Sequence, residues 1–206
     1  MTGLAAWALA AYLLGAIPSS MLAARYVAGV DLRRTGSGNL GATNLYRVLG
    51  WRYAIPVALF DAAKGTIPVL LFARWAGTGT LGALLFGLAA IAGHVFSVFA
   101  QFRGGKGVAT SAGVVLGLAP LAFLMALVAW AVVLWVTGYS SLSSILAAVV
   151  FPFAVALIYP GNAELLWFGV AMAGFITLLH RANIRRLLGG TESRFGRKPD
   201  QRGSAG

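Results

Sequence analysis

The sequence predicts an all-α integral membrane protein, a compact bundle of about seven transmembrane helices, one of them short, with the N-terminus outside and the C-terminus in the cytoplasm. Of the 206 residues, 59% are hydrophobic and 10% are charged, and the mean hydropathy is +0.83. This composition is far from that of a soluble domain. The apolar residues also fall in long runs, and shorter polar segments between them carry most of the charges, which is typical of a multi-pass membrane protein.

The first three apolar runs are each long enough to cross a bilayer at about 1.5 Å of rise per residue. We place these spans at residues 4–24, 53–73 and 81–100. Pro18 predicts a kink in the first span. The second span carries Asp61 and Lys64, which are three residues apart and therefore share one face of the helix. Charges inside a membrane are expensive, so this pair indicates either a functional role or an anchor between helices.

The apolar run from residue 108 to residue 136 is about 29 residues long, which is too long for one untilted span. Gly117 and Pro120 divide it, so we expect a short helix at 107–118 and a separate helix at 121–137. The short helix, about 18 Å in length, cannot cross the hydrocarbon alone and should be half-buried among its neighbours. Two further spans are expected at residues 142–159 and 163–180.

The distribution of charge supports this division. The chain has 16 Lys and Arg against 5 Asp and Glu, an excess that in a membrane protein indicates topology rather than nucleic-acid binding. With the long run divided, every large basic cluster falls on one side of the membrane, as the positive-inside rule expects. We interpret residues 1–188 as a single transmembrane domain and residues 189–206 as a basic cytoplasmic tail, loosely ordered against anionic lipid. The cations assigned to topology alone are Arg25, Arg33, Arg34, Arg52, Arg74 and those beyond Arg186.

Three polar segments should meet at the cytoplasmic face, at residues 37–52, 101–107 and 180–192, together with a serine run at 140–144. The first two are rich in glycine, and successive backbone N–H groups in a glycine-rich turn form a concavity that binds anions. Cations at Arg47, Arg103 and Lys106 would strengthen phosphate binding. Carboxylates are scarce and cysteines absent, so we expect neither paired-carboxylate catalysis, nor a thiolate nucleophile, nor a metal site.

These features alone leave several functions open. A membrane enzyme acting on phosphorylated substrates and a secondary transporter for an organophosphate anion fit them equally well. Against the transporter, the sequence shows no inverted repeat, and its polar clusters should lie at one face rather than at the midplane. A lipid-binding or assembly protein is a third alternative, although headgroup binding does not need so many Asn, Ser and Thr residues around glycine.

Five motifs occur in a fixed order along the chain: Gly-Ser-Gly-Asn-x-Gly-Ala-Thr-Asn at 36–44 with Arg47, Asp-x-x-Lys-Gly at 61–65, Gly-His at 93–94, Phe-Arg-Gly-Gly-Lys-Gly-Val-Ala-Thr at 102–110, and His-Arg-x-Asn-Ile-x-Arg-Leu-x-x-Gly-x-Glu at 180–192. Together they closely resemble the motifs of the bacterial membrane glycerol-3-phosphate acyltransferases that use acyl-phosphate donors, the PlsY-type family. The resemblance extends from the first span to Glu192.

The resemblance implies an acyl-phosphate:glycerol-3-phosphate acyltransferase, which catalyses the first step of phospholipid synthesis. A fatty acyl group would pass from acyl phosphate to the sn-1 hydroxyl of glycerol 3-phosphate, giving lysophosphatidic acid and phosphate by direct attack, without an acyl-enzyme. The active site would lie on the cytoplasmic face of the bacterial inner membrane. No cofactor, metal, nucleic acid or obligate protein partner is implied; the partners are the two substrates and the lipid bilayer.

The resemblance also implies roles for individual residues. Lys106 and His180, with Arg103, would hold the phosphate of glycerol 3-phosphate, and Asn183 would orient its hydroxyls or the reacting carbonyl. With Ser37, the residues Lys106, His180 and Asn183 form the catalytic set. The other substrate-binding residues would be Gly38, Asn39, Gly41, Thr43, Asn44, Arg47, Arg103, Gly104, Gly105, Ser141 and Ser144. Glu192 and the Asp61/Lys64 pair would fix these groups in place. The general base stays open between a substrate phosphate oxygen, which the resemblance favours, and neutral His180 or His94.

Overall fold

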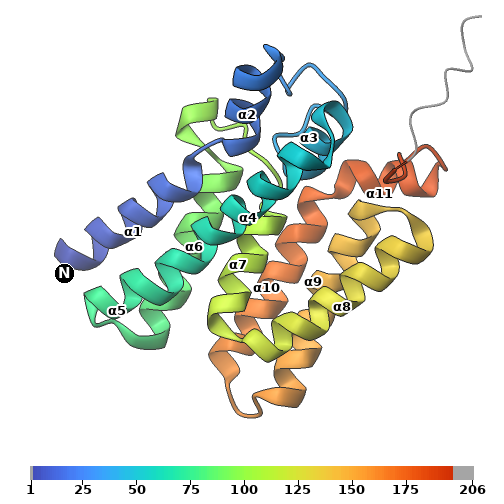
Figure 1. Cartoon of the computed structure of the whole chain (residues 1–206). Coiled ribbons are helices and arrows are strands. Elements are labelled where there is room, and N and C mark those ends of the chain that lie inside the picture. The colour runs from blue at the N-terminus through green and yellow to red at the C-terminus, as the bar shows by residue number, and fades with distance from the viewer. Residues whose placement is uncertain (1, 197–206) are drawn as a thin grey trace, which may run out of the picture.

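The computed structural model describes residues 2–196, which form helices and connecting turns with no strand among them. The helices, shown in Figure 1, are α1 (Thr2–Ala16), α2 (Ser19–Ala28), α3 (Ala42–Leu49), α4 (Trp51–Ile67), the π-helical turn η1 (Pro68–Phe72), α5 (Ala73–Ala76), α6 (Gly79–Val95), the 3-10 turn η2 (Val98–Ala100), α7 (Val108–Leu118), α8 (Pro120–Thr137), α9 (Ser140–Ile158), α10 (Ala163–Leu179) and α11 (Arg181–Leu188).

The apolar helices match the predicted spans to within a few residues at each end. Those long and apolar enough to cross a membrane are Gly3–Ala28, Trp51–Ala76, Gly79–Ala100, Pro120–Thr137 and Ser140–Ile158. The pair α10 and α11, bent by 61°, would add another, and α7 is a shorter apolar helix. An all-helical protein with several apolar spans is therefore confirmed, whereas the number of crossings and the orientation of the termini stay predictions.

The two breaks that proline predicts are both present. The helical run Gly3–Ala28 is interrupted at Ile17 and Pro18, between α1 and α2. The long run after residue 108 divides at Ala119, whose φ of −149° and ψ of 74° are not helical. Pro120 then opens α8, where its missing N–H leaves no hydrogen bond unmade.

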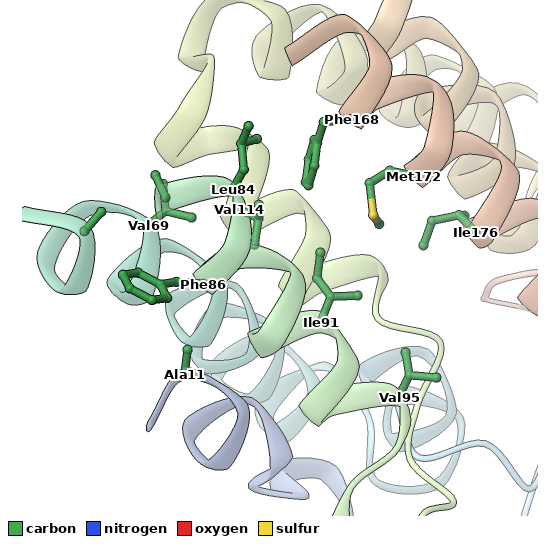
Figure 2. Packing of buried hydrophobic residues seen from close by; sticks show 12 residues of the cluster. Ala11, Val69, Leu84, Phe86, Ile91, Val95, Val114, Phe168, Met172 and Ile176 are labelled. Atoms are coloured by element: carbon green, nitrogen blue, oxygen red, sulfur yellow. The ribbon is translucent and has the colours of Figure 1, made fainter. Parts of the chain in front are cut away.

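The main apolar core is built around α6 (Figure 2). Buried residues of α6, including Phe86, Ile91 and Val95, pack with residues of α1, η1, α7 and α10. α7 packs on α4 with especially close backbones, because a Cβ on Gly113 would lie 1.8 Å from the Ala62 carbonyl oxygen. Such close approach through small residues is typical of helices in membranes, and it holds the short helix α7 among its neighbours.

Two helices were not expected from the sequence. α3 lies within the polar segment 37–52, which we interpreted as a loop, and α11 lies within the polar segment 180–192. Both carry apolar residues at positions i, i+3 and i+4: Leu45, Val48 and Leu49 in α3, and Ile184, Leu187 and Leu188 in α11. This spacing predicts an amphipathic helix, but each stretch is only 8 residues long.

The start of the C-terminal tail also differs from the prediction. Residues 191–195 were expected to be loosely ordered, but they pack on the rest of the protein. The Phe195 N–H donates to the Gly138 carbonyl oxygen at 2.6 Å, and the Phe195 ring stacks on Tyr46 with centroids 4.2 Å apart. The rest of the predicted tail, residues 197–206, lies outside the described residues.

Gly113→Ala should lower the thermal unfolding temperature of the detergent-purified protein. Its methyl would lie 1.8 Å from a backbone oxygen of α4, so α4 and α7 must move apart, at a cost of about 1–3 kcal/mol. Gly174→Ala is the matched control, because its methyl in α10 would meet no atom within 4 Å and should leave the unfolding temperature unchanged or raise it. Equal unfolding temperatures for the two variants would contradict the close packing of α4 on α7.

Candidate active site

Contacts between distant segments confirm that the predicted polar clusters meet at one end of the bundle (Figure 1). The hydroxyls of Thr43 and Ser140 lie 3.2 Å apart, which joins α3 to the start of α9. Arg47 Nη2 donates to the Ser193 carbonyl oxygen at 3.5 Å, which joins α3 to the tail. Lys106 Nζ donates to Asn183 Oδ1, which joins the second glycine-rich loop to α11.

The carboxylate of Glu192 is the centre of these contacts. It is buried, and its Oε1 accepts hydrogen bonds from Ser141 Oγ at 2.8 Å and from Asn183 Nδ2 at 2.6 Å. Its Oε2 accepts from Arg186 Nε at 2.7 Å. Since Asn183 also accepts from Lys106, Glu192 orients the amide that Lys106 contacts. The role of Glu192 in fixing other site residues stays a prediction, and these hydrogen bonds support it.

The surroundings of the cluster lower the pKa of both Glu192 and Lys106. Burial alone would raise the pKa of Glu192, but the three hydrogen bonds and the Arg186 charge outweigh it, so its pKa is lowered. Burial lowers the pKa of Lys106 to about 8; the Glu192 charge opposes this shift, and the Arg186 and Arg47 charges add to it. A partly buried ammonium of this kind gains from binding an anion.

His180 is held as a neutral imidazole. It is buried, and its Nδ1 lies 2.8 Å from the Ile176 carbonyl oxygen. In a neutral ring Nδ1 must donate to that oxygen, so Nε2 keeps a lone pair. Burial lowers the pKa of His180 to about 4, and the nearby charge of Lys106 adds to the shift. The ring can therefore accept a hydrogen bond at neutral pH but is a weak base.

Asn44 shapes the first glycine-rich loop from within. Its Nδ2 donates to the carbonyl oxygens of Leu32, Thr35 and Asn39 at 3.0–3.2 Å, and its Oδ1 accepts from the Ser37 N–H at 2.8 Å. The loop itself uses both ends of the Asn44 amide, whereas the predicted contact between Asn44 and substrate stays a prediction.

The other predicted residues of this loop are differently placed. Ser37 and Gly38 are exposed, whereas Asn39, Gly41 and Thr43 are half-buried. Arg47 is also half-buried, and its Nε has no hydrogen-bond partner among the described residues. Burial lowers the pKa of Arg47, against the charge of Glu192 and together with that of Arg186, although a guanidinium stays charged at any physiological pH.

The second glycine-rich loop lies directly on the end of α6. The N–H of Gly104 donates to the Val95 carbonyl oxygen at 2.9 Å, and the N–H of Gly105 donates to the His94 carbonyl oxygen at 3.2 Å. These two N–H groups are therefore used within the protein, and the contact of Gly104 and Gly105 with substrate stays a prediction. Arg103 is exposed, and its side chain makes no hydrogen bond to another described residue.

The Asp61/Lys64 pair is present but lies apart from the Glu192 cluster. Both side chains are 1% exposed, and Lys64 Nζ lies 2.6 Å from Asp61 Oδ1. Ser19 Oγ donates to the same oxygen at 2.5 Å, and Lys64 also donates to the Ile17 carbonyl oxygen at 2.8 Å. The pair therefore ties α4 to the break between α1 and α2.

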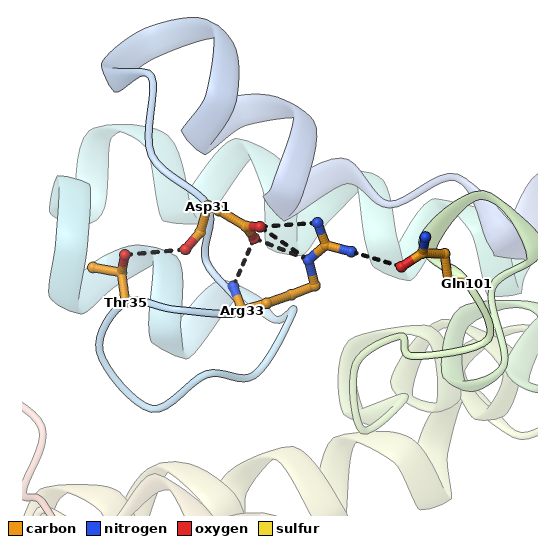
Figure 3. A network of polar contacts seen from close by, with 4 residues as sticks. All are labelled: Asp31, Arg33, Thr35 and Gln101. Atoms are coloured by element: carbon orange, nitrogen blue, oxygen red, sulfur yellow. Dashed lines mark hydrogen bonds and ion pairs between the residues drawn. The ribbon is translucent and has the colours of Figure 1, made fainter.

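An exposed network joins the two glycine-rich loops (Figure 3). The Arg33 guanidinium pairs with Asp31 at 2.9 Å and donates to Gln101 Oε1 at 3.3 Å. Hydrogen bonds from Arg33 lower the pKa of Asp31 to about 2. Our interpretation of Arg33 as a purely topological charge missed this link, because only the fold brings residue 101 next to residue 33.

Among the predicted residues, Ser144 lies away from the Glu192 cluster, and two residues with contacts at the site were not among those predicted. Ser144 donates to the Ser140 carbonyl oxygen at 2.8 Å and accepts from Trp130 Nε1 at 3.3 Å, so it faces α8 rather than the Glu192 cluster. Ser140, which contacts Thr43, and Arg186, which pairs with Glu192, were missed. The serine run has no periodic pattern that would distinguish its members. Arg186 lies in α11, and the turn after that helix brings Glu192 back to it.

Comparisons with known proteins identify the family. Residues 5–190 match the model of the family described as glycerol-3-phosphate acyltransferase. Among relatives of that name, the protein of Geotalea daltonii is 49% identical over 187 residues, covering 91% of this chain and 95% of the relative. The protein of Chlorobaculum parvum is 41% identical over 221 residues, with the same 91% and 95% coverage.

Two solved structures are similar to this one over nearly the whole chain. The crystal structure of PlsY (YgiH), an integral membrane glycerol 3-phosphate acyltransferase, in its glycerol 3-phosphate form has a TM-score of 0.87 and 38% identity, covering 94% of this chain and 96% of that one. The lysophosphatidic acid form of the same enzyme has a TM-score of 0.83 and 36% identity, covering 94% of this chain and 95% of that one. This chain therefore belongs to the glycerol-3-phosphate acyltransferase family, as a PlsY-type integral membrane enzyme.

Proposed function

We propose that this acyltransferase takes its acyl group from an acyl phosphate and transfers it to the sn-1 hydroxyl of glycerol 3-phosphate, at the cytoplasmic face of the bacterial inner membrane. The observation that carries the proposal is the hydrogen-bonded series Lys106–Asn183–Glu192, with Arg47 nearby. Lys106 and Arg47 are two partly buried cations, and each of the two substrates carries one phosphate that a cation can bind. Family membership favours this enzyme over a transporter or a lipid-binding protein.

The internal contacts leave a defined set of groups for substrate. Lys106 has three N–H donors and uses one on Asn183, so two are left for the phosphate of glycerol 3-phosphate. Asn183 has two N–H donors and uses one on Glu192, so the other can orient the reacting carbonyl or a glycerol hydroxyl. The lone pair of His180 Nε2 can accept from a glycerol hydroxyl. Arg47, with Ser37, would hold the acyl-phosphate head.

The mechanism we infer is a direct attack. The sn-1 oxygen of glycerol 3-phosphate forms a bond to the acyl carbon, the bond from that carbon to the phosphate oxygen breaks, and inorganic phosphate departs. The hydroxyl proton passes to a phosphate oxygen of a substrate, since His180 is too weak a base to be preferred. An acyl phosphate is already activated, so the protein needs only to align the reactants and stabilise the developing charge.

Release of inorganic phosphate from palmitoyl phosphate, measured with and without glycerol 3-phosphate, tests the reaction on the purified protein in lipid. Release should require the acceptor glycerol 3-phosphate. The rate of release should fall by about 100-fold or more in Lys106→Ala and in Asn183→Ala, because each substitution removes N–H donors that bind or orient the substrates. No release from any acyl phosphate by a folded sample that accepts another acyl donor would exclude the proposed donor.

The pH dependence of kcat/KM for glycerol 3-phosphate tests the role of Lys106. Since the pKa of Lys106 is lowered to about 8, the ammonium is charged below this pH and loses its charge above it. We expect kcat/KM to fall about tenfold per pH unit above pH 8. Lys106→Arg should be less active but should lack this decline, because a guanidinium stays charged. A decline that persists unchanged in Lys106→Arg would assign the titration to another group.

Glu192→Gln separates the charge of Glu192 from its hydrogen bonds. The amide can still accept from Asn183, but it loses the ion pair with Arg186, so kcat should fall while the protein stays folded. Glu192→Ala leaves Asn183, Ser141 and Arg186 without their shared acceptor. It should therefore also lower the free energy of unfolding, by about 1–3 kcal/mol, and with it the unfolding temperature. Glu164→Ala, which changes an exposed carboxylate, is the control. Full activity of Glu192→Ala would contradict the positioning role.

A further inference from the structure

His94 lies between the two glycine-rich loops, directly behind the loop that carries Lys106. It is near the end of α6 and is 8% exposed. A Cβ added to Gly105 would lie 2.4 Å from His94 Nε2 and 2.4 Å from the Leu40 carbonyl oxygen. The imidazole edge therefore supports the backbone of Gly105, whose N–H also donates to the carbonyl oxygen of His94.

The opposite edge of the ring is held by the Asp61/Lys64 pair. Lys64 Nζ lies 3.4 Å from His94 Nδ1, in addition to its contacts with Asp61 and the Ile17 carbonyl oxygen. An ammonium has three N–H donors and no acceptor, so these partners use all its donors and Nδ1 of His94 is an acceptor. A neutral ring then carries its proton on Nε2, the nitrogen that faces Gly105.

Both ring nitrogens of His94 therefore face protein groups: Nδ1 faces Lys64, and Nε2 faces the backbone of Gly105. This geometry also gives the buried Asp61/Lys64 pair of α4 a structural role beside His94. A buried ion pair contributes little stability beyond what well-packed apolar residues supply, but it fixes the orientation of the ring it contacts. The place of Gly105, and therefore the starting point of the next residue, Lys106, depends on that orientation.

We propose that His94 is a positioning residue for substrate binding: held by Asp61 and Lys64, its ring sets the place of Gly105 and so directs the Lys106 ammonium toward the phosphate of glycerol 3-phosphate. The inference rests on the proposed function, in which Lys106 binds that phosphate. Behind the binding loop, hydrogen bonds connect Ser19 and Ile17 to Asp61 and Lys64, and Lys64 to His94.

Steady-state kinetics of His94→Ala and His94→Gln test the proposal. His94→Ala leaves a gap behind Gly105, so KM for glycerol 3-phosphate should rise about tenfold or more, while kcat and KM for the acyl donor change less than about threefold. His94→Gln places an amide near the position of Nε2 and should recover most of the lost affinity. Recovery by Gln distinguishes positioning from a loss of folding, which Gln would not repair selectively for one substrate.

Thr66→Val is the matched control for a half-buried polar contact of α4, the helix that carries Asp61 and Lys64. Thr66 Oγ1 donates to the Gly113 carbonyl oxygen at 2.8 Å, between α4 and α7, and does not touch the loop. Its loss should lower the unfolding temperature without changing KM for glycerol 3-phosphate. An unchanged KM in His94→Ala, or an equal rise in Thr66→Val, overturns the proposal.

A spectroscopic measurement tests it without turnover. The chain has 2 histidines, so nitrogen-15 histidine labelling gives two imidazole spectra, which His180→Gln assigns. We expect His94 to carry its proton on Nε2 and its Nε2 signal to shift when glycerol 3-phosphate is added to the wild type. A proton on Nδ1, or a His94 signal that does not respond, overturns the proposal. A wild type that never releases phosphate would instead overturn the proposed donor reaction.

Discussion

Charges buried in a membrane protein need partners inside the protein, because lipid supplies neither hydrogen bonds nor counter-charges. Two groups of residues meet this requirement here. The carboxylate of Glu192 takes donors from Ser141, Asn183 and Arg186, and the Asp61/Lys64 pair is completed by residues 17, 19 and 94. Each group joins segments that are distant in the sequence, so pairing the buried charges also brings the polar loops together.

The chemistry of the site follows from what this pairing leaves unused. Both oxygens of the Glu192 carboxylate accept hydrogen bonds from protein donors, and one of these donors is Asn183. Lys106 and Asn183 each keep N–H donors, and His180 keeps a lone pair, after their internal contacts are made. The cluster therefore has donors for phosphate and for a polarised carbonyl but no strong base, which suits a substrate that is already activated.

The start of the tail packs on the site residues of α3. Ser193 and Phe195 contact Arg47 and Tyr46 of α3, and the Phe195 N–H donates to the Gly138 carbonyl oxygen between α8 and α9. Arg47 is thus held by a segment some 146 positions away in sequence. The second glycine-rich loop is supported from within by α6, and the first is shaped by Asn44. The cations that we assign to the two substrate phosphates, Arg47 and Lys106, therefore depend on separate supports.

The sequence by itself determined the class of fold, the approximate extent of its apolar helices, the break at Pro120 and the family. These depend on local information: runs of apolar residues long enough to cross lipid, prolines that cannot continue a helix, and motifs in order. Only the tertiary structure decided which polar residues use their hydrogen bonds internally. Asn44, Ser144, Gly104 and Gly105 resemble ligand-binding residues in sequence, yet their partners are loop carbonyls, Trp130 and the end of α6. A hydrogen bond depends on distance and direction between groups that the chain brings together from far apart, and no local pattern contains either.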